Sequence, residues 1–181
     1  MGIKQHNGNT KADRLAELEI RSPSIQLIKY GAIGLNAIIF SPLLIAADLG
    51  SQNGTNITIS DGDRITGDTA DPSGNLYGVM TPAGNTPGNI NLGNDVTVNV
   101  NDASGYAKGI IIQGKNSSLT ANRLTVDVVG QTSAIGINLI GDYTHADLGT
   151  GSTIKSNDDG IIIGHSSTLT ATQFTIENSN G

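Results

Sequence analysis

Short apolar stretches alternate with turn residues over most of the chain, and none of them has the period of a helix. In Val96-Thr97-Val98, and in similar segments up to Ile176, apolar side chains recur at every second position. A period of two is expected of strands, whose side chains point alternately to the two faces. Gly, Asn, Asp and Ser separate the segments, as they do in turns. The pattern predicts an all-β fold of short strands after residue 47.

Two of these segments belong to a long internal repeat. Residues 109–126 and 160–176 both begin with Gly-Ile-Ile-Ile and both contain Leu-Thr-Ala, followed after two residues by an apolar residue and Thr. A third copy begins at Gly136 and a weaker one at Gly78, so the repeated glycines are 31, 27 and 24 residues apart. A unit of about 25 residues with up to three short strands cannot bury a core alone, whereas stacked units can.

The repeat therefore predicts a right-handed parallel β-helix, a solenoid of about five coils over residues 48–181. Each strand pairs with the same strand of the next coil at about 4.8 Å, and the inward Ile, Leu and Val side chains form one column. We expect the repeated glycines to supply the positive φ of sharp corners, and turn asparagines to stack in hydrogen-bonded ladders. An antiparallel sandwich of short strands is the alternative.

The composition removes several kinds of chemistry. The chain has no cysteine, which excludes disulfides, thiolate metal sites and a cysteine nucleophile. The formal net charge is −6, and the basic residues beyond position 47 are few and scattered. A surface that follows nucleic-acid phosphates needs clustered Lys and Arg, so we expect no nucleic acid among the partners. We also expect no small-molecule cofactor.

Residues 1–47 have the order of charge and hydropathy of an extended signal peptide. A basic leader runs into the apolar stretch 30–47, which ends in small residues. We expect cleavage between Ala47 and Asp48, with the bond after Ala46 as second choice, although Ile45 departs from the usual small residue three positions back. A transmembrane anchor is the alternative. The residues that count against it lie within the stretch: Asn36, Ser41 and Pro42.

Three groups of polar residues invite a chemical interpretation. For the first two a solvated turn is the simpler one, and for the third the fold alone does not establish a function. A hydrolase triad would combine the segment His165-Ser166-Ser167 with Asp158 or Asp159. A calcium site would use the acidic run: Asp61, Asp63, Asp68 and Asp71. A lyase-like, polysaccharide-acting enzyme would combine carboxylates with a base: Asp127, Lys155, Asp158 and Asp159. Because the nucleophile motifs of secreted serine hydrolases and the closing glutamate of an EF-hand are absent, we predict no catalytic and no metal-binding residue.

The middle isoleucines of the two Gly-Ile-Ile-Ile runs are candidate contact residues. If Ile110 and Ile112 point inward, Ile111 points outward, and Ile162 does the same in the second run. An outward isoleucine either lies under a loop or forms a sticky flank for self-association or host contact.

The long charged leader, the absence of cysteine and the repeated Gly-Ile-x-Ile, Leu-Thr-Ala and Leu-Gly-x-x-Ser-x-Ile blocks together resemble the N-terminal passenger of a pertactin-like autotransporter, a type V secreted protein of Gram-negative bacteria. The resemblance is to an uncharacterised enterobacterial member of that family. It implies Sec export, a C-terminal β-barrel in the outer membrane, and a β-helical passenger that folds at the cell surface. We expect residues 48–181 to be the N-terminal part of such a passenger, truncated and without the barrel.

The resulting hypothesis is a non-enzymatic, exported protein. In the full-length protein the chain would form a surface-exposed stalk with an adhesion or cell-contact role in virulence, and alone it would be periplasmic or secreted. Its partners would be the Sec export machinery, signal peptidase, and a host surface or a second copy. Two alternatives stay open: a small secreted β-helix enzyme acting on polysaccharides, and the non-functional product of a disrupted gene.

Overall fold

The computed structural model describes residues 45–179, and within that range every regular element is a strand. The shortest strands have two residues and lie in the first two coils, and the strands of the later coils have four to seven residues. In chain order the strands are β1 (Asp48–Leu49), β2 (Gln52–Asn53), β3 (Asn56–Ile59), β4 (Arg64–Gly67), β5 (Thr69–Ala70), β6 (Leu76–Met80), β7 (Asn89–Asn94), β8 (Thr97–Asp102), β9 (Tyr106–Ile112), β10 (Ser118–Asn122), β11 (Thr125–Gly130), β12 (Ser133–Leu139), β13 (His145–Thr150), β14 (Thr153–Ser156), β15 (Asp159–Ile163), β16 (Thr168–Thr172) and β17 (Thr175–Asn178).

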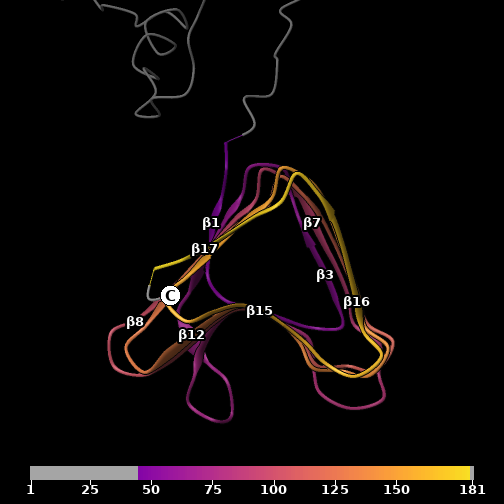
Figure 1. Ribbon diagram of the computed structural model, residues 1–181, viewed down its shortest axis with the longest axis horizontal. Coiled ribbons are helices and arrows are strands. Elements are labelled where there is room, and N and C mark those ends of the chain that lie inside the picture. Colours follow the sequence, from indigo (N-terminus) through magenta and orange to yellow (C-terminus); the bar gives the residue numbers. More distant parts are fainter. Residues whose placement is uncertain (1–44, 180–181) are drawn as a thin grey trace, which may run out of the picture. The chain divides into compact units, whose positions relative to one another are not determined.

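These strands form three parallel sheets that wind into a right-handed β-helix, as predicted (Figure 1). Sheet A has the order β1-β4-β8-β11-β14-β17, sheet B has the order β15-β12-β9-β6-β2, and sheet C has the order β16-β13-β10-β7-β3. Seen along the stack, the three sheets make the three walls of a triangle. The five strands of sheet C agree with the predicted number of coils, and the parallel ladders rule out the antiparallel sandwich.

The repeat positions of the sequence stack directly above one another. In sheet A, Val98 pairs with Val126, Val126 with Ile154, and Ile154 with Ile176. The first three of these side chains are fully buried, within one continuous apolar core that runs through the coils. Because each fully buried aliphatic side chain contributes about 1.5–3 kcal/mol, this column is the main source of stability.

The repeated glycines do not form corners, which corrects the sequence expectation. Gly78, Gly109, Gly136 and Gly160 lie inside β6, β9, β12 and β15, and none has a positive φ. A Cβ atom on Gly109 would lie 2.4 Å from the carbonyl oxygen of Gly136 and 2.4 Å from a methyl group of Val126. These positions are glycine because sheet A presses its Val and Ile side chains against the backbone of sheet B.

Most of the positive φ values lie instead at two other corners. Between sheets C and A they form a stack of five residues: Gly62, Asp95, Arg123, Gly151 and Gln173. The first four donate their N–H to a carbonyl of the next coil, for example Asp95 to Asn122 at 3.1 Å. Between sheets B and C, non-glycine residues take the same conformation, namely Asn116, Tyr143 and Ser166.

The predicted asparagine ladder is present beside the first of these corners. Asn94 Nδ2 donates to Asp61 Oδ2 at 3.0 Å, and Asn122 Nδ2 donates to Asn94 Oδ1 at 2.8 Å. The backbone N–H of Thr150 completes the ladder by donating to Asn122 Oδ1 at 2.9 Å. The side chains thus link four successive coils.

Residues 1–44, which include nearly all of the predicted signal peptide, lie outside the described range. Among residues 45–179 there is no helix of the length and hydropathy that a membrane span requires.

Candidate functional site

The outer face of sheet A carries a row of polar and charged side chains that follows the axis of the stack. Strand register places Thr66, Asn99, Asp127, Lys155 and Glu177 side by side on successive strands. Parallel pairing aligns each strand with its counterpart in the next coil, and it brings these residues together although the coils differ in length. The row is polar because residues that alternate with the buried Val and Ile positions must face water.

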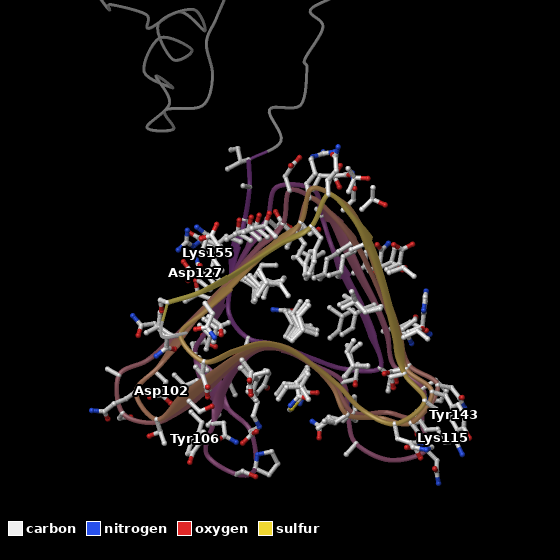
Figure 2. All side chains as sticks on the ribbon, in the orientation of Figure 1. Asp102, Tyr106, Lys115, Asp127, Tyr143 and Lys155 are labelled. Carbon is white, nitrogen blue, oxygen red and sulfur yellow. The ribbon has the colours of Figure 1, made fainter. Side chains whose placement is uncertain are left out.

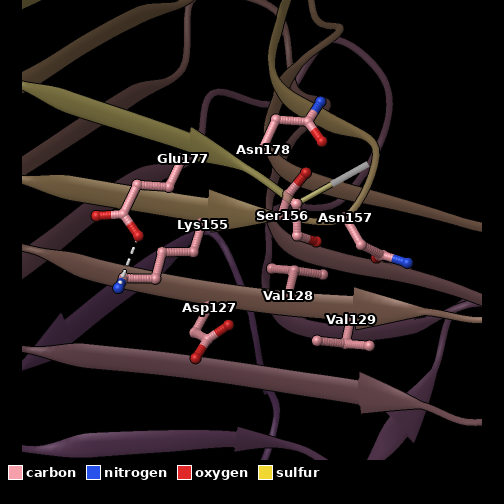
Figure 3. A pocket seen from close by; sticks show the side chains of 9 residues that line it. Asp127, Val128, Val129, Lys155, Ser156, Asn157, Glu177 and Asn178 are labelled. Carbon is pink, nitrogen blue, oxygen red and sulfur yellow. Dashed lines mark ion pairs between the residues drawn. The ribbon is translucent and has the colours of Figure 1, made fainter. Parts of the chain in front are cut away.

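Two shallow depressions lie along this row. One has a volume of about 320 Å³ and is lined by residues that include Lys155 and Glu177 (Figure 3). The other has a volume of about 200 Å³ and is lined by residues that include Arg64 and Asn99. Asp127 and Val129 contribute to both, so the depressions are adjacent on the outer face of the sheet, and we call the two together the sheet A groove.

Opposite charges alternate along the groove. Lys155 Nζ lies 2.8 Å from Glu177 Oε2, and the hydrogen bond with Glu177 raises the pKa of Lys155, helped by the charges of Glu177 and Asp127. At the other end, Arg64 Nε lies 4.0 Å from Asp48 Oδ1. These side chains remain about half exposed or more, so their hydrogen-bonding groups face solvent and are accessible to a polar partner.

The residues considered for a polysaccharide-acting enzyme are only partly brought together. Asp127 and Lys155 are direct neighbours in the register of β11 and β14, a proximity that sequence spacing did not reveal. Asp158 and Asp159 lie past the end of β14, toward sheet B, where Asp158 accepts a hydrogen bond from Ser133 Oγ and Asp159 pairs with Ile135. The four residues therefore do not form one site.

The candidate triad has the wrong geometry for acyl transfer. Ser166 Oγ lies 3.0 Å from His165 Nδ1, and the carboxylate nearest to the histidine belongs to Asp142, with 3.9 Å between Oδ1 and the same Nδ1. A catalytic histidine must contact the nucleophile through one ring nitrogen and the carboxylate through the other. All three side chains lie on an exposed corner, as expected for turn residues.

The four carboxylates of the acidic run each bind separate partners instead of converging. Asp61 accepts from Asn94, Asp63 from Ala47, and Asp68 from Ser51, which leaves Asp71 in a turn of its own. Across residues 45–179 no group of three or more carboxylates and histidines is close enough to hold a metal ion.

Asp71 is not a solvated turn residue, since its side chain is only 8% exposed. Burial alone would raise its pKa, but hydrogen bonds from Asn75, Lys108 and the Ser73 amide outweigh that effect and lower the pKa to about 2. Lys108 Nζ lies 3.1 Å from Asp71 Oδ2. The pair ties the loop before β6 to the outer face of sheet B.

Ile111 points outward as expected, and it is covered, which is one of the two alternatives left open for it. Ile111 does point away from the core that contains Ile110 and Ile112, but it is only 1% exposed because it packs with Tyr77 and Met80. Asn138 stands between Ile111 and Ile162 in the register of sheet B, and Ile162 is half-buried. Ile111 is therefore covered and not available as a contact residue, whereas a contact role for Ile162 stays a hypothesis.

Sequence reasoning missed the polar corners on either side of sheet B (Figure 2). At the corner with sheet C, Lys115 Nζ lies 5.6 Å from the centre of the Tyr143 ring, and Tyr143 is 55% exposed. At the corner with sheet A, Asp102 and the half-exposed Tyr106 lie together. Only the stacking register shows that Lys115 and Tyr143 belong to consecutive coils, so their proximity was not readable from the sequence.

The predicted cleavage bond lies at the edge of the fold. Ala47 donates its N–H to Asp63 Oδ1 at 2.8 Å, and Asp48 is the first residue of β1. The structure thus describes both residues that flank the predicted bond.

Comparison with known proteins gives close relatives but no family model and no solved structure that matches the chain. All 181 residues are 97% identical to the "Probable autotransporter YcgV" of Escherichia coli (strain K12), of which they cover 19%. They are also 97% identical to a protein named YcgV from Escherichia coli O157:H7, of which they cover 33%. The chain thus spans between about a fifth and a third of the length of these relatives. The resemblance to an enterobacterial autotransporter is confirmed, and it supports a passenger-domain origin.

Proposed function

We propose that this chain, so similar to an enterobacterial autotransporter, is part of a passenger that is exported to the cell surface and acts there in adhesion or cell contact. The observation that carries the proposal is the combination of a parallel solenoid with a row of polar and charged side chains along the outer face of sheet A. Parallel β-helices lengthen by adding coils, so the fold suits a stalk that holds binding surfaces away from the membrane.

The sheet A groove is the contact surface that we assign to this stalk. Its charges alternate in sign, and its donors and acceptors face solvent on a flat sheet. Such surfaces favour a partner with complementary charge, either a host surface or another copy of the passenger, and they determine specificity and association rate more than raw affinity. We propose a non-enzymatic role for the groove, because it is shallow and open, whereas catalytic sites are usually enclosed clefts.

Export in this proposal follows the Sec route, with removal of the leader by signal peptidase. The absence of cysteine supports this route, because a disulfide formed in the periplasm would hinder passage of an unfolded chain through the outer membrane.

The proposal is tested by displaying the full-length protein and measuring cell–cell and cell–surface binding after the double substitution Asp127→Asn and Lys155→Gln. A loss of binding at unchanged surface abundance supports the contact role of the groove. Unchanged binding contradicts it.

The neighbouring Asp127 and Lys155 also favour one second candidate, an enzyme that acts on an acidic polysaccharide. In that case purified passenger would depolymerise such a substrate, and the same double variant would lack that activity while still binding cells.

A further inference from the structure

Among the described residues, Ala47 is the first whose backbone forms hydrogen bonds with the solenoid. Its N–H donates to Asp63 Oδ1 at 2.8 Å, and its carbonyl accepts from the Arg64 N–H at 2.8 Å. No hydrogen bond within residues 45–179 involves Ile45 or Ala46, and both are exposed. The hydrogen bonds of the coil therefore begin at the nitrogen of Ala47, which is the nitrogen that cleavage of the Ala46–Ala47 bond would leave as the new N-terminus.

Asp63 is a buried carboxylate that lacks a side-chain cation. It is 8% exposed, and it accepts hydrogen bonds from the N–H groups of Ala47 and Ser60. No lysine, arginine or histidine of the described chain forms an ion pair with it. Since a buried charge is costly unless it is paired, the Ala47 nitrogen is the place where a positive charge would stabilise Asp63.

We propose that the exported protein begins at Ala47 and that its new α-ammonium group forms an ion pair with the Asp63 carboxylate. In the cleavage step, water adds its oxygen to the carbonyl carbon of Ala46, the C–N bond to Ala47 breaks, and the released amine takes up a proton. This inference rests on the proposed export, and it selects the second of the two bonds that the sequence offered.

The competing bond would damage the fold. Cleavage between Ala47 and Asp48 removes the N–H that Asp63 Oδ1 accepts and also the carbonyl that the Arg64 N–H needs. The sequence itself does not separate the two bonds. Each has an alanine before it and a large aliphatic residue three positions back, Leu44 in one case and Ile45 in the other.

The first test is to sequence the N-terminus of the full-length protein's passenger after its isolation from the cell surface. We expect Ala47 as the first residue. A passenger that begins at Asp48, at Met1 or at any other residue overturns the inference. If the protein is not exported, the proposed function fails. Purified signal peptidase, acting on the detergent-solubilised precursor, then decides between the two bonds, and cleavage after Ala47 again overturns the inference.

The second test measures the ion pair itself through the rate at which an amine-directed acylating reagent labels the N-terminus near neutral pH. Only the uncharged amine reacts, and a neighbouring carboxylate keeps it charged, so wild type should react about three- to tenfold more slowly than Asp63→Asn. The control is Asp61→Asn, because Asp61 shares the turn but accepts from Asn94. The other charged neighbours in sequence, Asp48 and Arg64, are unchanged in all three proteins. Equal rates in wild type and Asp63→Asn would overturn the pairing.

Discussion

Lys155 and Glu177 occupy facing positions on β14 and β17, with 2.8 Å between Lys155 Nζ and Glu177 Oε2. Both side chains are about half exposed, so the pair is screened by water and salt and adds little to folding. Together with Asp127 on the preceding strand it gives the outer wall of sheet A a fixed alternation of charge. The pair therefore matters for what the surface contacts more than for the stability of the coil.

Charge reversal at Lys155 separates these two effects. In the full-length displayed protein, Lys155→Glu should weaken cell binding roughly three- to tenfold, because it places three carboxylates side by side along the groove. The thermal midpoint of the purified passenger should change little. Binding is measured by cell aggregation and surface attachment at low and physiological salt. Lys115→Glu, at a corner away from the groove, is the matched control and should leave binding unchanged.

The column of repeated glycines predicts a strong packing requirement. Gly109→Ala should destabilise the purified passenger by about 2–4 kcal/mol, because the new methyl group would overlap the Gly136 carbonyl and Val126. Chemical denaturation measures the difference. Gly54→Ala is the control, since its nearest neighbour would lie 3.7 Å away, and it should cost less than about 0.5 kcal/mol. Equal effects of the two substitutions would contradict the close approach of sheets A and B.

Much of this fold was predictable because strand periodicity and internal repetition specify a stack almost completely. The coils, the buried Val126 and Ile154, and the asparagine ladder all follow from residue types that recur in register. The role of Gly109 was not predictable, because glycine is selected both by positive φ and by close packing, and the sequence does not distinguish these causes. The adjacency of Asp127 and Lys155 was hidden for another reason: coils differ in length, so only the folded register shows which surface residues meet.

The ion pair between the buried carboxylate of Asp71 and Lys108, which we call the clamp, predicts that folding stability depends on pH. The folded pKa of Asp71, about 2, lies below its ordinary value of 3.8, so the deprotonated form is favoured in the folded state. The resulting stabilisation is fully present above about pH 4 and is lost as the pH falls toward 2, by about 2 kcal/mol in total. Unfolding of the purified passenger between pH 2 and 6 measures it.

Asp71→Asn should remove this part of the pH profile. The control is Asp142→Asn, because Asp142 is an exposed carboxylate at the corner beside His165. If the Asp71→Asn profile runs parallel to that of wild type, the clamp does not contribute.

The asparagine ladder makes Asn122 the residue that joins three coils at one corner. Its Nδ2 donates to Asn94 Oδ1 and its Oδ1 accepts from the Thr150 N–H, so Asn122→Ala leaves one acceptor and one backbone donor without a partner. We expect a loss of about 1–3 kcal/mol in the free energy of unfolding. Asn122→Asp keeps the acceptor for the Thr150 N–H, but it replaces the donor to Asn94 with a charged acceptor. We therefore expect its loss of folding stability to be larger at neutral pH than at acidic pH, where the new carboxylate is protonated.

The control is Asn91→Ala, on the exposed face of β7, which should be nearly neutral. Hydrogen exchange of the Thr150 amide gives the local measurement, since the ladder model requires faster exchange in Asn122→Ala than in Asn122→Asp.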